Sequence, residues 1–280
     1  MPDCSRPSTP DSAAWQASLQ LRFEDDAGTT RLTRRVHSGP LRVQKPLYPE
    51  GPGICHAIMI HPPGGIVGGD QLAIAADAGP AAHAFLTSPG AAKWYRANGK
   101  LSQQRVTLCA ASGSAIEWMP QETIFYNEAH VRMVHEVDLA PDACYIGAEI
   151  LCFGRSASGE RFTRGQVAQR TTIRRGGKLL WWEQGMLRGG SSAIDSVFGL
   201  GGATVCATLI GVGAPVPAPL LADLRALDPL LAATQIKAVF CARLLCADSE
   251  HAKRVMTRVW QTLRPHLLGC AATIPRIWHT

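Results

Sequence analysis

Apolar and polar residues alternate along the first three quarters of the chain in a pattern typical of β-strands. The first run covers residues 19–24, where Leu19, Leu21 and Phe23 alternate with polar residues before a turn over 25–30. Similar runs predict further strands over 57–61, 72–78, 84–88, 101–109, 114–119, 123–126, 131–139, 145–153, 167–174, 178–183, 204–212 and 236–246. Because no long helical pattern separates these runs, we predict no βαβ units.

Helical spacing occurs only late in the chain. Leucines recur at helical spacing over 220–231, and a second run begins at a cap formed by Asp248 or Ser249 and stops at Pro265. The stretch 197–222 carries no charge, but glycines and prolines interrupt it, so we predict a buried strand there rather than a membrane span. With no linker and no internal repeat, the prediction is mainly β: a single domain of many short strands over 15–280, with two late α-helices.

Composition and charge limit the classes of function. The chain has 280 residues, of which 46% are hydrophobic and 18% charged, so it can bury a large core. The net charge of +6 is spread without a basic run, which argues against a nucleic-acid partner. Nine widely spaced cysteines, an odd number, indicate a reducing, cytoplasmic compartment. Residues 1–14 lack the apolar segment of a signal peptide, and we predict a flexible tail there.

A loop rich in proline and glycine is the most unusual local feature. Its residues are His61, Pro62, Pro63, Gly64, Gly65, Ile66, Val67, Gly68, Gly69 and Asp70. The glycine spacing is that of a phosphate-binding loop, but Asp70 stands where a lysine would neutralise phosphate, so a nucleotide site is not predicted. His130 and His135 are five residues apart and cannot converge on one metal ion locally, and no Cys-x-x-Cys pair indicates structural zinc.

Three carboxylates interrupt apolar strand runs: Glu117, Glu149 and Glu183. A buried ionised carboxylate is costly unless it is paired, hydrated or bound to a cation. One alternative is that these residues pair with basic side chains, for which the candidates are Arg155, Arg161, Arg170 and Lys178. The other is that some of them line a wet internal passage for a hard or borderline cation. The residues alone leave both alternatives open.

Several blocks in fixed order resemble the UreD (UreH) family of urease accessory proteins, from about residue 15 to the end. The blocks are residues 39–51, the loop 61–70, 87–96, 117–122, 151–155 with 159–160, 264–265 and 275–280. Two departures from the family pattern are Trp94 in place of phenylalanine and Ala148-Glu149 in place of Trp-Asp. The second departure keeps the negative charge but lengthens the side chain.

The resemblance implies a non-catalytic chaperone that acts with UreF-like and UreG-like (GTPase) proteins in the GTP-dependent insertion of nickel into apo-urease. It also implies a stacked, helical arrangement of strands, no tightly bound cofactor, and an internal tunnel for transient nickel(II). The positions that match the family's acidic sites are Asp70, Glu149 and Glu183. Motif residues expected to bind partners or support the structure are Lys93, Tyr95, Arg96, Arg155, Glu160, Arg276 and Trp278.

Two other functions are weighed against the conduit. One is a metal-free scaffold that joins a UreF-like protein to urease. The other is a small-molecule enzyme in which the glycine-rich loop forms the pocket and Asp70 acts as general base, although no second catalytic partner accompanies Asp70 in a recognisable motif.

Overall fold

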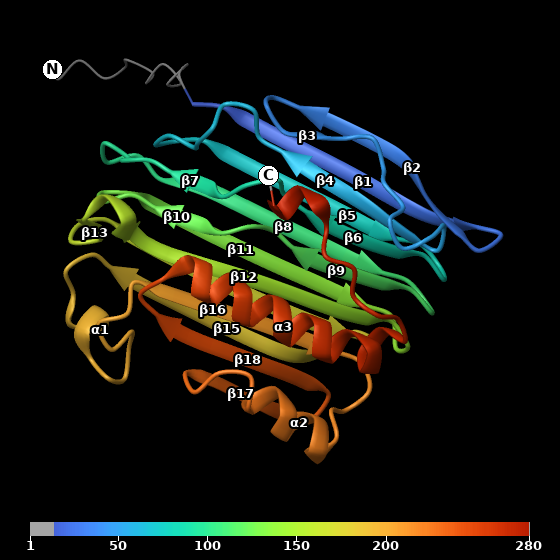
Figure 1. Ribbon diagram of the computed structural model, residues 1–280. Coiled ribbons are helices and arrows are strands. Elements are labelled where there is room, and N and C mark those ends of the chain that lie inside the picture. The colour runs from blue at the N-terminus through green and yellow to red at the C-terminus, as the bar shows by residue number, and fades with distance from the viewer. Residues whose placement is uncertain (1–13, 280) are drawn as a thin grey trace, which may run out of the picture.

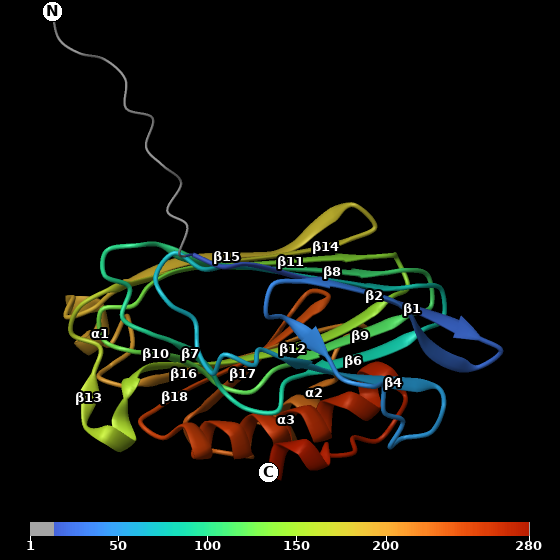
Figure 2. The same ribbon diagram turned by 90° about the horizontal axis from the view of Figure 1, so that it is seen from above.

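A computed structural model describes residues 14–279, and the tail expected over 1–14 therefore lies almost entirely outside the described residues. Two β-sheets lie face to face, and helices cover the outer face of one of them (Figures 1 and 2). The fold is mainly β and forms one stacked arrangement, which confirms the predicted class.

The first sheet contains seven strands in the order β15-β14-β11-β8-β5-β1-β2. Its strands are β1 (Gln16–Asp26), β2 (Thr29–Ser38), β5 (Gln71–Ala78), β8 (Ser102–Ala110), β11 (His130–Leu139), β14 (Gln166–Arg175) and β15 (Lys178–Arg188). The strands from β1 through β5, β8 and β11 to β14 are parallel, while β2 and β15 pair antiparallel at the two edges.

The second sheet contains eleven strands. They are β3 (Arg42–Val43), β4 (Ile54–Ile60), β6 (His83–Thr87), β7 (Ala92–Trp94), β9 (Ala115–Met119), β10 (Thr123–Phe125), β12 (Cys144–Arg155), β13 (Glu160–Arg161), β16 (Val205–Val212), β17 (Leu231–Ile236) and β18 (Val239–Cys246). Strands β4, β6, β9 and β12 are parallel, and β16, β18 and β17 extend the sheet antiparallel. From β4 to β14 the chain passes back and forth between the sheets, which produces a stacked coil of parallel strands.

Alternating residues of the second sheet divide the molecule into two cores. On β12, Tyr145 and Leu151 face the first sheet, whereas Ile146 and Ile150 face the helices. One core therefore lies between the sheets and the other between the second sheet and α3 (Figure 2). The face of the sheet on which a residue lies therefore determines which of the two cores its side chain enters.

The helices within residues 14–279 differ from the prediction in detail. They are α1 (Ser192–Asp195), α2 (Ala218–Arg225) and α3 (Ser249–Leu268), with short 3-10 turns at Ser156–Ser158 and Arg276–His279. The helix predicted over 220–231 was too long, because the chain turns at Asp228 and Leu231 begins β17. Asp248 caps α3 as predicted, accepting the Glu250 N–H at 3.0 Å.

The predicted end of α3 at Pro265 was wrong. Pro265 lies inside the helix, which continues to Leu268 and ends at Gly269, whose φ is +68°. A proline removes only one helical N–H bond, and so close to the end little of the helix remains to be disrupted. The Gly269 N–H closes the last turn on the Pro265 carbonyl at 3.1 Å.

Candidate functional site

The glycine-rich loop connects β4 to β5 and is held by a buried carboxylate. Asp70 is 1% exposed. Its Oδ1 accepts the backbone N–H of Trp15 at 2.9 Å, and its Oδ2 accepts that of Val67 at 3.1 Å. The Asp70 carboxylate therefore fixes the loop against the start of β1.

Two glycines let the same loop approach the segment that follows β7. A Cβ atom at Gly65 would lie 2.2 Å from the ring of Tyr95, and one at Gly68 would lie 2.0 Å from the Ala97 carbonyl oxygen. Since real Cβ contacts are never this short, only glycine permits this packing. The Tyr95 hydroxyl donates to the Gly64 carbonyl at 3.4 Å.

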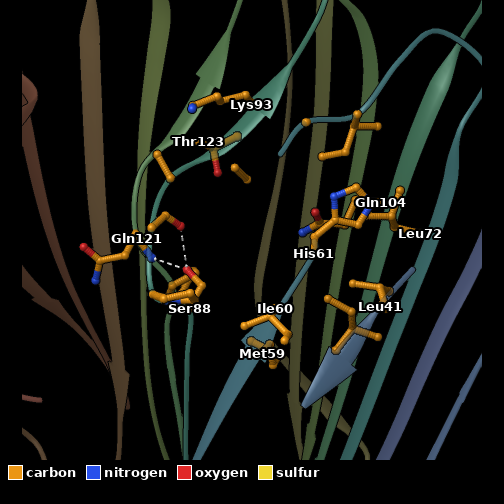
Figure 3. Close-up of a pocket in the computed structure, with 18 of the residues that line it drawn as sticks. Leu41, Met59, Ile60, His61, Leu72, Ser88, Lys93, Gln104, Gln121 and Thr123 are labelled. Atoms are coloured by element: carbon orange, nitrogen blue, oxygen red, sulfur yellow. Dashed lines mark hydrogen bonds between the residues drawn. The ribbon is translucent and has the colours of Figure 1, made fainter. Parts of the chain in front are cut away.

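A cavity of about 340 Å³ opens beside this loop (Figure 3). His61, Leu72 and Gln104 lie on one side of it, and Ser88, Gln121, Thr123 and Lys93 on the other. It extends between the sheets to Trp118, Met133 and Glu149.

His61 contributes an uncharged imidazole to this cavity. Burial lowers the pKa of His61, and the opposing charge of Asp70 does not compensate for it. Its Nε2 is buried without a hydrogen-bond partner among residues 14–279. The loop thus places the imidazole of His61, with its Nε2 unpaired, in the lining of the first cavity.

A second cavity of about 110 Å³ lies between the sheets on the side of β15 and β18. The polar and charged residues that line it come from both sheets: His135, Glu149, Gln169, Thr171, Glu183, Thr208 and Arg243. These residues lie on the inward faces of their strands. Most other inward-facing residues of β11, β12 and β14 are apolar and belong to the core between the sheets. Polar groups gathered on core-facing positions make this part of the interior able to hold water and ions.

Glu149 lines both cavities and therefore lies between them. Its carboxylate, 19% exposed, accepts a hydrogen bond from Gln169 Nε2 and lies 3.7 Å from His135 Nδ1. The Tyr145 hydroxyl lies 3.1 Å from the other ring nitrogen of His135. Burial, and after it the negative charge of Glu149, raises the pKa of Tyr145, so the phenol stays neutral.

Glu183 and Arg243 form the far side of the second cavity. Arg243 Nη2 donates to Glu183 Oε1 at 2.7 Å, and both side chains are about 40% exposed (38% and 40%). Burial lowers the pKa of Arg243, but its electrostatic interactions, of which that with Glu183 is the largest, together outweigh burial, and the pKa lies above its ordinary value. This ion pair therefore stands between the polar interior and solvent.

The structure brings Glu149 and Glu183 together but does not place Asp70 with them. Asp70 lines neither cavity, and backbone N–H groups occupy both of its oxygens. Pairing with a basic side chain, one of the two alternatives left open by the sequence, is confirmed for Glu183 with Arg243 and for Glu117 with Arg264. The partners named from the sequence were wrong: Arg155 pairs with Glu160, Arg170 pairs with Glu136, and Arg161 lies near Asp195. Lys178, the fourth candidate, is paired with Arg175 across the hairpin register and lines neither cavity.

Glu117 belongs to a different site, on the face of the second sheet that α3 covers. It is fully buried, and its carboxylate accepts hydrogen bonds from Trp260 Nε1 at 2.7 Å and from Arg264 Nη2 at 2.9 Å. His83 Nε2 lies 2.7 Å from the same carboxylate. Burial raises the pKa of Glu117, but His83 and Arg264 outweigh it and hold the pKa below its ordinary value.

Arg264 also binds a second carboxylate, Glu50, in the turn before β4. His56 Nε2 lies 2.7 Å from Glu50 Oε1. The residues Glu50, His56, His83, Glu117 and Arg264 thus form a buried network that ties α3 to the second sheet.

The remaining motif residues have these contacts. Lys93 lines the first cavity, and Arg96 pairs with Glu128. Arg155 pairs with Glu160 and lies over the Tyr126 ring, 4.4 Å from its centre. Trp278 is buried and donates to Thr87 Oγ1 at 2.8 Å, whereas Arg276 is exposed.

Sequence reasoning missed His135, Gln169 and Arg243 as members of the site. His135 was considered only as a metal partner of His130, which faces away from it. The signal available in the sequence was the alternation of β11, in which His135 shares a face with Val131, Met133 and Val137. A histidine in such a row points into the core, but its neighbours on other strands cannot be deduced from spacing.

Metal-ligating side chains are sparse in the part of the chain that the structure describes. No group of three or more His, Cys, Asp or Glu side chains that could hold a metal ion occurs within residues 14–279. The cysteines over the same range are all free thiols.

The fold and the cavities define a class: a two-layered β protein with two neighbouring cavities between its sheets, one beside a glycine-rich loop and the other lined by polar and charged side chains. The model of the UreD urease accessory protein family matches residues 16–279. The chain belongs to this family.

Individual relatives agree over nearly the whole chain. A urease accessory protein UreD from Janthinobacterium sp. (strain Marseille) is 61% identical over 271 residues, covering 95% of this chain and 92% of the relative. The UreD of Nitrosospira multiformis is 48% identical over 273 residues, with 95% and 98% covered. Membership in the family implies a role in urease maturation. No helix within residues 14–279 has the length and apolar character needed to cross a membrane.

Proposed function

We propose that this chain is a chaperone that assists the GTP-dependent insertion of nickel into apo-urease, acting in the cytoplasm with UreF-like and UreG-like (GTPase) partners. We propose further that nickel(II) travels as cargo through the space between the sheets. The observation that carries the second part is that two neighbouring cavities share one lining carboxylate, Glu149, and that the second cavity is also lined by the partly exposed Glu183.

The chemistry of the lining suits a cation that must not stay. Carboxylate, amide and imidazole groups bind borderline divalent ions, and water can fill the rest of the coordination shell. Thiolates would hold nickel more firmly, but burial raises the pKa of Cys206, the cysteine that lines the second cavity, and so keeps it a thiol. The second cavity therefore offers weak ligands, whereas the first is lined mainly by apolar side chains.

In this proposal Asp70 serves the passage indirectly. It fixes the loop beside which the first cavity opens, and it supplies no ligand to the cavity itself. The same geometry argues against the small-molecule enzyme, because a general base needs a free carboxylate facing the pocket.

A metal-free scaffold that joins a UreF-like protein to urease is the second candidate. It is favoured by exposed apolar side chains on the side of β15 and α1, of which Phe198 is 98% and Val197 86% exposed. Such side chains are typical of protein interaction sites. A scaffold and a conduit can share this surface, so the two functions differ only in whether the interior carries nickel.

Removal of charge from the passage distinguishes the two. Glu149→Gln and Glu183→Gln keep the size of the side chain while weakening its affinity for cations. The conduit predicts that both variants still co-purify with the partners and apo-urease, while nickel per urease active site falls several-fold. Full nickel occupancy with an intact complex would leave the scaffold as the function.

A further inference from the structure

His135 and Glu149 both line the second cavity, and Glu149 also lines the first. Nδ1 of His135 lies 3.7 Å from Oε1 of Glu149, which is too long for a hydrogen bond. Bonds from a divalent transition metal to an imidazole nitrogen and to a carboxylate oxygen are each about 2.1 Å long. A single ion can therefore touch both atoms with little movement of either side chain.

The surrounding residues hold this pair in position. The Tyr145 hydroxyl lies 3.1 Å from His135 Nε2, and the Trp118 ring packs edge-on against the imidazole at 5.7 Å. When Nε2–H donates to the Tyr145 oxygen, Nδ1 is the unprotonated nitrogen and is free to bind a metal ion beside Glu149. A hydrogen bond from the second ring nitrogen to a neighbouring oxygen is typical of metal-binding histidines.

Two further features serve the same geometry. Gln169 Nε2 donates to Oε2 of Glu149, which leaves Oε1 toward His135. A Cβ atom at Gly147 would lie 1.8 Å from the Tyr145 hydroxyl oxygen, so only glycine at this position lets the phenol lie along the strand and reach His135.

We propose that His135 and Glu149 form a two-ligand staging site for nickel(II) within the passage, oriented by Tyr145 and Gln169. This inference rests on the proposed conduit and adds a defined stop to it. The ion binds there through one nitrogen, one carboxylate oxygen and water. With only two protein ligands, its affinity is high enough to measure, but it dissociates readily. An imidazole ligand also favours nickel over magnesium or calcium, which prefer oxygen ligands alone.

The test compares nickel(II) binding by variants of the full chain co-purified with a UreF-like partner. His135→Gln keeps a side-chain N–H for Tyr145 but removes Nδ1. We expect at least about a tenfold loss of nickel(II) affinity in equilibrium dialysis and loss of imidazole scattering in the nickel X-ray absorption spectrum. The matched control is His130→Gln on the same strand, which lines neither cavity and should change neither measurement.

Tyr145→Phe provides a second route, because it keeps the imidazole and removes only the group that orients it. It should weaken nickel(II) binding by about tenfold. An unchanged affinity and spectrum in His135→Gln, or in Tyr145→Phe if His135→Gln does not fold, would overturn the staging site. If His135→Gln loads urease normally while Glu149→Gln does not, the conduit stands without the staging site; if both load urease normally, the conduit fails as well.

Discussion

At the scale of single residues, carboxylates with apolar sequence neighbours serve different purposes in this chain. Asp70 binds backbone, Glu117 binds Arg264, and Glu149 faces a cavity. The low exposure of Glu117 and Glu149 could be predicted from the apolar residues near them in the sequence, whereas Asp70 follows two glycines and gives no such signal. Their partners could not, because Arg264 is 147 residues from Glu117 in the sequence and only the packing of α3 brings the two together.

Asp70 stabilises the fold by holding the glycine-rich loop, so its removal should lower stability. Asp70→Ala leaves the N–H groups of Trp15 and Val67 without their acceptor, and we expect the free energy of unfolding to fall by about 2 kcal/mol. Urea denaturation of the purified variant measures this change. A variant as stable as the wild type that fails only in nickel loading would instead make Asp70 a ligand.

At the scale of elements, strands that bury at least one apolar face could be predicted most closely. β5, β11 and β16 lie within about a residue of their predicted bounds. β2 was missed because most of its side chains are exposed, and its sequence shows no regular alternation of apolar and polar residues. The single strand predicted over 236–246 is interrupted at Lys237, whose φ of +53° turns the chain from β17 into β18.

The attachment of α3 to the second sheet depends on the buried charge network. Glu117→Gln removes a charge that faces Arg264, and we expect a loss of about 3 kcal/mol in the free energy of unfolding at neutral pH. Arg264→Met, which fills similar space without charge, should also destabilise by leaving Glu50 and Glu117 facing each other. Stability within about 0.5 kcal/mol of the wild type in Glu117→Gln would contradict this account.

The same carboxylate predicts a dependence on pH. Because folding lowers the pKa of Glu117 from its ordinary value of 4.5, its stabilising contribution is complete above that value and disappears as the pH falls through the lower, folded-state pKa. The difference in stability between wild type and Glu117→Gln should therefore shrink below pH 4.5. Thermal unfolding at a series of pH values measures it, and a difference that grows toward acid would reverse the predicted sign.

The C-terminal turn is a further element whose role can be tested. Ile277 and Trp278 are large apolar residues near the end of the chain, where exposure to solvent would be unfavourable. Trp278 is buried in the core beside α3 and donates to Thr87, and Ile277 packs against the same core. Trp278→Ala should lower the free energy of unfolding by about 3 kcal/mol. Deletion of residues 275–280 should abolish urease activation, and activation at the wild-type level by the truncated chain would overturn this role.

At the scale of the whole molecule, the stacking of two sheets creates the second cavity, which no single strand reveals. The polar side chains of the second cavity come from six strands, and each looks like an isolated exception in its own strand. Register between strands is set by long-range pairing, which the local pattern does not specify. The carboxylates could therefore be predicted as candidates, but His135, Gln169 and Arg243 could not be assigned to the same space.

Exposed apolar side chains should lower the solubility of the isolated chain. Val197, Phe198, Trp182 and Met186 are all more than half exposed. We expect the isolated chain to be poorly soluble and to become soluble when co-produced with a UreF-like partner. Size-exclusion chromatography should then show one co-eluting species, and two separate, well-behaved peaks at micromolar concentration would count against it.

The most direct test of the central claim is to close the passage and count the nickel delivered. Thr171→Phe from one sheet and Leu151→Phe from the other each place a ring in the second cavity, and Gln184→Phe places the same ring on an exposed position of β15 as control. In complexes that assemble fully, the account predicts that both plugging variants lower nickel per urease active site by about tenfold or more, while Gln184→Phe does not. Wild-type nickel occupancy with either plug in an intact complex would contradict the account.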